Sequence, residues 1–136
     1  KKVQGNEDAY RNIDFRIAER SSIWSKKNGI HHYMLISAIG ADSNSSNFYL
    51  RLKGETEQAV LENDLAKTTI FRPSLLIGER NERRLAEGVG QAILPLFSFL
   101  LPKKYRPIKA EHLAKLMIQT IELQNEKTII WQNGLY

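Results

Sequence analysis

A tyrosine and a lysine four positions apart, Tyr49 and Lys53, are the residues of this chain best suited to carry chemistry. On a helix this spacing places both side chains on one face. A lysine ammonium beside a phenol favours the phenolate, so the tyrosine can exchange a proton near neutral pH. Ser37 lies twelve residues upstream, and its hydroxyl could hold a substrate oxygen. Together the three residues predict a proton-transfer site, although a Tyr-x-x-x-Lys pair alone is common by chance.

The elements that must position these residues alternate between helix and strand. Hydrophobic periodicity predicts helices over residues 6–27, 47–62, 85–94 and 111–123, and strands over residues 30–36, 68–77 and 127–132. The apolar run in residues 30–36 is continuous, which predicts a strand buried on both faces. Ser37 follows this strand, and in open α/β sheets ligands bind beyond the carboxyl ends of strands. The alternation predicts an α/β fold with a parallel sheet.

Composition bounds the class of protein. The chain has 136 residues, enough for one domain, with 42% apolar and 26% charged residues and a net charge of +5. It has no cysteine, which excludes disulfide frameworks, cysteine-based zinc sites and thiol nucleophiles. It has no apolar run long enough to span a membrane and no nucleic-acid-binding motif. We therefore expect no membrane or nucleic-acid partner, and a cytoplasmic location.

A metal site is not expected either. His31 and His32 are adjacent on a predicted strand and so point to opposite faces of the sheet, while His112 is distant in sequence. Arg80, Arg83 and Arg84 are interpreted as a solvated surface or, alternatively, as a site for an anionic substrate. The apolar segment 93–101 is interpreted as core or a dimer interface or, alternatively, as a lid over the substrate.

Two segments resemble a known superfamily. Residues 37–60, SAIGADSNSSNFYLRLKGETEQAV, followed by TTIFRPSLLIGER, resemble the short-chain dehydrogenase/reductases, and most closely their atypical CC3/Tat-interacting-protein-like branch. The resemblance extends from about residue 8 to residue 116. It implies a Rossmann-like doubly wound parallel sheet and a cofactor that is NADP or NAD. It also implies an oxidoreductase or epimerase-like activity on an unidentified small molecule.

The resemblance implies roles for matching positions. Tyr49 would be the acid/base or a contact to the nicotinamide ribose, and Lys53 would bind the ribose hydroxyls. Ser37 would be the hydroxyl on the substrate side. The turn Arg72-Pro73-Ser74 would lie beside the nicotinamide. Asn12 matches only loosely an asparagine that many members of the superfamily have on the corresponding helix.

The chain departs from the superfamily in two places. Many members have two consecutive serines where this chain has Ser37-Ala38, and the second is often catalytic. The superfamily also begins with a strand, a glycine-rich turn and a helix that binds the pyrophosphate, and this chain offers only Gly88 and Gly90 inside a helical pattern. The resemblance thus implies that residues 1–136 are the C-terminal portion of one Rossmann-like domain.

These departures leave two hypotheses open. In the first, the chain is part of an NAD(P)-dependent oxidoreductase or epimerase-like enzyme that uses Tyr49, Lys53 and Ser37. In the second, which Ala38 favours, it is a catalytically weak NADP(H)-binding sensor or protein-interaction module. Half of a doubly wound sheet would also leave a bare strand edge, so we expect these residues alone to be insoluble or to form a homo-oligomer.

Overall fold

The computed structural model describes residues 7–77, 106–122 and 127–132. Several expectations lie outside these residues: the helix over 85–94, the apolar segment 93–101, and the roles of Arg80, Arg83 and Arg84. Within the described residues, the elements alternate as the sequence predicts, and the chain is α/β with a parallel sheet.

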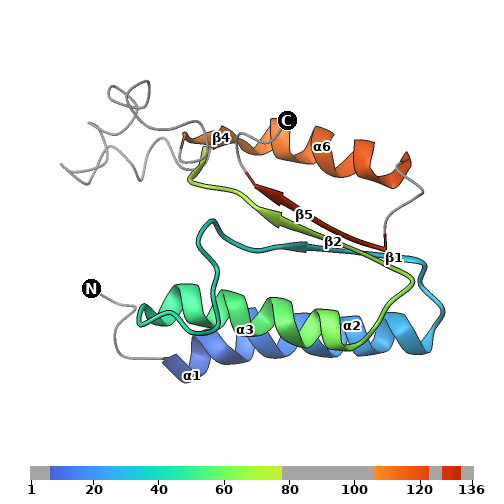
Figure 1. Cartoon of the computed structure of the whole chain (residues 1–136), viewed down its shortest axis with the longest axis horizontal. Coiled ribbons are helices and arrows are strands. Elements are labelled where there is room, and N and C mark those ends of the chain that lie inside the picture. The colour runs from blue at the N-terminus through green and yellow to red at the C-terminus, as the bar shows by residue number, and fades with distance from the viewer. Residues whose placement is uncertain (1–6, 78–105, 123–126, 133–136) are drawn as a thin grey trace.

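The centre of the structure is a three-stranded parallel sheet (Figure 1). Its strands are β1 (His32–Ile36), β2 (Lys67–Arg72) and β5 (Thr128–Gln132), in the order β1-β2-β5. In register, Thr68 of β2 lies opposite Tyr33 of β1 and Thr128 of β5. Two short strands, β3 (Leu76–Ile77) and β4 (Ile108–Lys109), pair separately, also in parallel.

Helices cover both faces of the sheet. On one face lies a helical segment made of α1 (Glu7–Tyr10), a π-helical turn η1 (Arg11–Phe15) and α2 (Arg16–Lys27), with α3 (Phe48–Glu62) beside it. The other face is covered by α6 (Ala110–Glu122), as Figure 1 shows. Among the described residues, no helix combines the length and the apolar character that a membrane crossing requires.

Local sequence signals explain where the helices begin and end. Asn47 caps α3, since its side-chain oxygen accepts a hydrogen bond from the backbone N–H of Leu50. Gly29 ends α2 with a φ of +66°, a conformation that favours glycine. The observed bounds of α3, α6 and β5 lie within a residue of the predicted ones. The predicted strand 68–77 is divided, because Pro73 closes β2 and β3 belongs to the second sheet.

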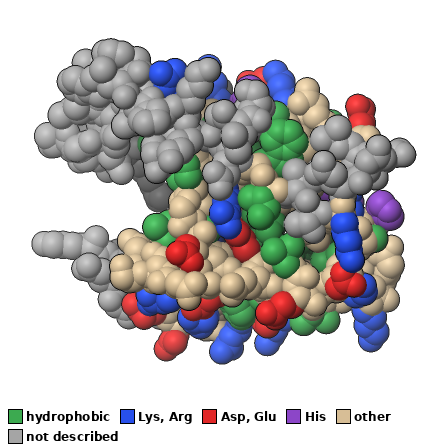
Figure 2. Space-filling view, in the orientation of Figure 1, with side chains coloured by type: hydrophobic (Ala, Val, Ile, Leu, Met, Phe, Trp, Pro, Cys, Tyr) green, Lys and Arg blue, Asp and Glu red, His purple; other side chains and the backbone are tan. Residues whose placement is uncertain are grey.

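The central strand β2 separates two kinds of interior. Phe71 packs toward α6, in a core cluster with Ile108 and Leu113. Arg72 faces α3 instead, where it pairs with Glu57. Because successive side chains of a strand alternate between faces, Lys67, Thr69 and Phe71 share the α6 face, and Thr68, Ile70 and Arg72 share the α3 face. Figure 2 shows hydrophobic side chains between the helical layers and charged side chains over α2 and α3.

One expectation about the sheet was wrong. The continuous apolar run predicted that β1 is buried on both faces, yet its residues are half-buried and Ile36 is 44% exposed. The strand buried on both faces is β2, although three of its residues are lysine and threonine. A run of apolar residues indicates burial but does not say which strand is central. Among the described residues β1 pairs only with β2 and so has a free edge.

Candidate functional site

Tyr49 and Lys53 lie on the same face of α3, as their spacing predicts. The Nζ of Lys53 is 5.7 Å from the centre of the Tyr49 ring, within the range of a cation–π contact. The side chain of Lys53 is only 13% exposed, whereas Tyr49 is 45% exposed. The structure thus places a largely withdrawn ammonium over the ring of an accessible tyrosine.

Lys53 is held by a carboxylate that sequence reasoning missed. Its Nζ donates a hydrogen bond to Oδ1 of Asp14, at 2.6 Å, and Asp14 lies in the π-helical turn η1. A second ion pair, Arg11–Glu55 at 2.8 Å, joins the same turn to α3. Asn12, the loose match to a superfamily asparagine, is exposed. A helical period of 3.6 residues does not anticipate a π turn, so no pattern in the sequence pointed to Asp14.

Ser37 is the first residue after β1, at the carboxyl end of the strand. Its backbone N–H donates to the carbonyl of Phe71 at 2.7 Å, which ties the ends of β1 and β2 together. Ser37 is 6% exposed, and its Oγ finds no hydrogen-bond partner among the described residues. A buried hydroxyl without a partner is unfavourable and often marks a functional position. The next residue, Ala38, is also buried and carries no hydroxyl.

The loop after β1 is packed directly on α3 at Gly54, the residue after Lys53. A Cβ at Gly54 would overlap the backbone of Asp42 and Ser43. The backbone N–H of Asp42 also donates to the carbonyl of Leu50 at 3.1 Å. Glycine therefore permits an approach that no other residue would allow. This contact fixes the end of β1, which carries Ser37, relative to the helix that carries Tyr49 and Lys53.

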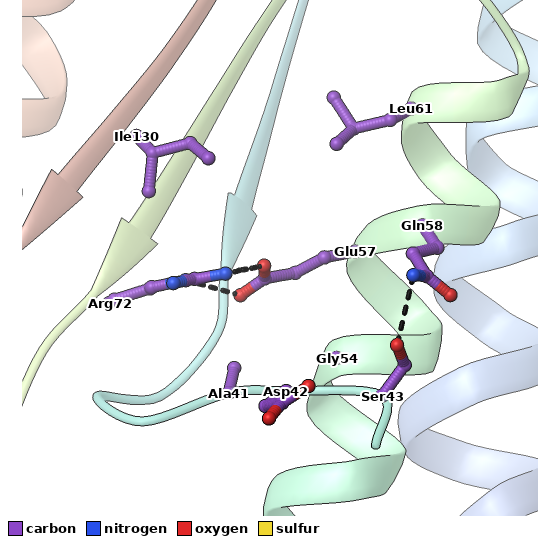
Figure 3. Close-up of a pocket in the computed structure, with 9 residues that line it drawn as sticks. All are labelled: Ala41, Asp42, Ser43, Gly54, Glu57, Gln58, Leu61, Arg72 and Ile130. Atoms are coloured by element: carbon purple, nitrogen blue, oxygen red, sulfur yellow. Dashed lines mark hydrogen bonds and ion pairs between the residues drawn. The ribbon is translucent and has the colours of Figure 1, made fainter. Parts of the chain in front are cut away.

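Arg72 of β2 and Glu57 of α3 are hydrogen-bonded to each other and both line a cavity of about 230 Å³ (Figure 3). Arg72 donates from Nε at 2.9 Å and from Nη2 at 2.5 Å to the carboxylate of Glu57, which is 3% exposed. These hydrogen bonds raise the pKa of Arg72 above its ordinary value, against the opposing effect of burial. The guanidinium is thus bound to Glu57, and its predicted contact with a cofactor stays a prediction.

The rest of the predicted turn also lies at the carboxyl end of the sheet. Pro73 is buried, and its carbonyl accepts a hydrogen bond from the backbone N–H of Ile39 at 2.9 Å. Ser74 donates through Oγ to the carbonyl of Arg106. The structure therefore links the turn after β2 to the loop after β1. His32, by contrast, lies on the α6 face and contacts the hydroxyl of Thr69 at 2.8 Å.

Comparison with known proteins identifies relatives that include proteins named FMP52 and HTATIP2. The chain is 43% identical to the mitochondrial protein FMP52 of Coccidioides immitis over 65 residues, which are 48% of the chain and 26% of the relative. It is 29% identical over 119 residues to FMP52 of Debaryomyces hansenii, covering 84% of the chain and 51% of the relative. It is 36% identical over 80 residues to the protein HTATIP2 of Rattus norvegicus, covering 59% and 33%.

These matches support the resemblance to the CC3-like branch, of which HTATIP2 is a relative. No family model matches the chain. The matched part of the chain spans about half the length of these relatives or less.

The same comparison corrects the expected location. FMP52 is named mitochondrial in Coccidioides immitis, Debaryomyces hansenii and Candida albicans, which contradicts the cytoplasmic expectation. That expectation took a reducing cytoplasm as the default compartment, with the absence of cysteine as weak evidence for it. A lack of cysteine excludes disulfides, but it does not distinguish one reducing compartment from another.

Proposed function

We propose that the chain is part of an NAD(P)-dependent oxidoreductase of the atypical short-chain dehydrogenase/reductase type, with a Rossmann-like doubly wound sheet. Its substrate would be a small carbonyl or hydroxyl compound, or a nucleotide sugar if the chemistry is epimerase-like. The observation that carries the proposal is the position of Lys53, withdrawn from solvent and 5.7 Å from the ring of the accessible Tyr49. The relatives named HTATIP2 and FMP52 support the same class of protein.

The residues at this site fit the nicotinamide-ribose half of NADP or NAD. The Lys53 ammonium has three N–H donors, of which Asp14 accepts one, so donors remain for the ribose hydroxyls. The buried Ser37 hydroxyl lacks a partner among the described residues and would gain one from a ligand. Arg72, Pro73 and Ser74 would border the nicotinamide, with the backbone of the turn as the contacting surface.

Each residue has a defined part in the proposed reaction. When bound, the nicotinamide supplies or accepts the hydride. Tyr49 would give its phenolic proton to the substrate oxygen in reduction and take it back in oxidation. Lys53 would stabilise the resulting phenolate through its positive charge. Ser37 would donate a hydrogen bond to the same substrate oxygen and so orient it.

Ala38 supports a second candidate function. Where many members of the superfamily have a second serine, this chain has a buried alanine. With one hydroxyl fewer at the strand end, the protein could bind NADP(H) and respond to it without efficient turnover. It would then act as a sensor or a protein-interaction module. The names of the FMP52 relatives support a mitochondrial location for either function.

The test is calorimetric titration of the full-length gene product with NADPH and then NADH, with the intact mass recorded for the same sample. We expect one of the two cofactors to bind tightly. Substrate screening with Tyr49→Phe follows: turnover should collapse while cofactor affinity changes little. Tyr33→Phe is the matched control, because Tyr33 bonds Ser21 and Ala18 on α2. No cofactor binding would refute both functions, and binding without turnover of any substrate would favour the sensor.

A further inference from the structure

We propose that Asp14 is the positioning residue for Lys53, holding its ammonium where Tyr49 and the cofactor ribose require it. This inference rests on the proposed function. It concerns a residue to which neither the spacing of the sequence nor the superfamily resemblance assigns a role.

The geometry of the pair supports a positioning role. The carboxylate of Asp14 and the ammonium of Lys53 are 2.6 Å apart, and their side chains are 28% and 13% exposed. Charge-assisted hydrogen bonds of this length are among the strongest in proteins. A lysine stem has four rotatable bonds and loses much rotamer entropy when it is fixed. Without an anchor the Nζ would sample many positions, so the carboxylate selects the one beside the Tyr49 ring.

Asp14 lies in the π-helical turn, which packs against α3. A π turn contains one more residue than an α-helical turn, and each added residue rotates the following side chains by about 100°. Such turns are rare and occur often at functional sites. In this chain the turn comprises residues 11–15, and both Arg11 and Asp14 make ion pairs with α3. The irregularity therefore lies where the helical segment meets the candidate catalytic lysine.

The neighbouring ion pair Arg11–Glu55 is an internal control for a purely structural role of Asp14. Arg11 and Glu55 join the same turn to the same helix, and Glu55 lies two residues from Lys53. If Asp14 only clamps the two helices together, loss of either ion pair should have a similar effect. If Asp14 positions Lys53, loss of Asp14 should weaken the affinity for the ligand that Lys53 binds, whereas loss of Glu55 should not.

The experiment is a double-mutant cycle on the full-length protein with NADPH as the probe. Dissociation constants are measured for wild type, Asp14→Asn, Lys53→Met and the double variant, together with the melting temperature of each. We expect Lys53→Met to weaken binding about tenfold or more and Asp14→Asn about fivefold. In the double variant, Asp14→Asn should add nothing to the effect of Lys53→Met.

Two further variants keep the result decisive. Asp14→Glu retains the carboxylate and should recover part of the affinity that Asp14→Asn loses, even if the asparagine variant is poorly folded. Glu55→Gln should bind NADPH within about twofold of wild type, whatever its melting temperature.

The proposal is overturned if Asp14→Asn weakens binding equally in the presence and absence of Lys53, or if Glu55→Gln has the same effect as Asp14→Asn. It is also overturned if Lys53→Met loses affinity while Asp14→Asn does not, a result that leaves the proposed function standing. If wild type does not bind NADPH or NADH, the proposed function fails and this inference fails with it.

Discussion

The side-chain contacts on the two faces of β2 differ in kind. Toward α6, Phe71 packs with Ile108 and Leu113, and half-buried side chains such as Met34 and Leu116 surround them. Toward α3 lie the polar groups of the candidate site: the Arg72–Glu57 pair and the hydroxyl of Ser37, which has no hydrogen-bond partner among the described residues, with the Lys53–Asp14 pair between α3 and η1. Each face also carries residues of the other kind, Lys67 and Thr69 toward α6 and the fully buried Ile70 toward α3. The polar groups of the candidate site, which a ligand could use, lie on the α3 side.

This contrast separates the residues expected to determine stability from those expected to bind a ligand. Burying apolar area contributes about 25 cal/mol per Å², whereas a buried ion pair is often no better than apolar side chains of the same volume. Because such pairs add little stability, polar groups kept near a strand end indicate a role other than stability. We therefore expect substitutions on the α3 face to change ligand affinity, and substitutions on the α6 face to change the free energy of unfolding.

The largest effect on stability is expected from Phe71→Ala. Phe71 is 1% exposed and central to the α6 cluster, and truncation of a buried phenylalanine costs about 3–5 kcal/mol. Chemical denaturation of the full-length protein measures this loss, and Phe71→Leu, which keeps most of the volume, should lose less. NADPH affinity below the melting temperature should not change. An equal loss of affinity would show that the two faces are not separate in function.

Gly54→Ala tests the α3 face by a purely steric change. Alanine is normally the better helix former by about 1 kcal/mol, but here its Cβ would overlap the backbone of Asp42 and Ser43. Overpacking against this backbone should cost about 3 kcal/mol and weaken cofactor binding, because the loop after β1 must shift. Gly29→Ala is the comparison variant. Its Cβ meets nothing, and only its positive φ is strained, so it should lose about 1 kcal/mol and no affinity.

Much of this arrangement follows from sequence, and the exceptions have physical reasons. Periodicity and capping residues are local signals, so α3, α6 and β5 were predicted within a residue, and the Tyr49–Lys53 pair shares a face as its spacing requires. Sheet order is set by non-local packing: burial on both faces was expected for residues 30–36, whereas the structure buries β2, including Thr68 and Thr69.

The partners of the site residues were not predicted for the same reason. Asp14 and Lys53 are 39 positions apart, and Glu57 and Arg72 are 15 apart. No pattern within one helix or strand encodes such pairs. The roles of Ser37, Tyr49 and Lys53 in binding a cofactor stay predictions.

Glu57→Gln should lower the free energy of unfolding by an intermediate amount. It leaves the Arg72 guanidinium, whose side chain is 20% exposed, without its carboxylate in a largely buried place. The expected cost is about 2 kcal/mol, somewhat less than for a fully buried pair. The double variant Glu57→Leu, Arg72→Met removes both charges and should recover most of that loss. If the double variant is as unstable as Glu57→Gln, the pair stabilises the α3 face directly and the contrast with the α6 face is weaker than argued.

The smallest effect on stability is expected from His32→Gln. His32 lies on the α6 face, which is not purely apolar. Burial, and next the positive charges of Lys67 and His31, lower the pKa of His32 below its ordinary value. Its other close neighbour, Thr69, is uncharged. As pH falls, the unfolded chain takes up this proton first, so the contribution of His32 to stability is present above about pH 6.5 and is lost below it. In denaturation series from about pH 8 to pH 5, the stability of wild type relative to His32→Gln should decline with acidity. A difference between wild type and His32→Gln that is independent of pH would mean that both states of the chain bind this proton equally well.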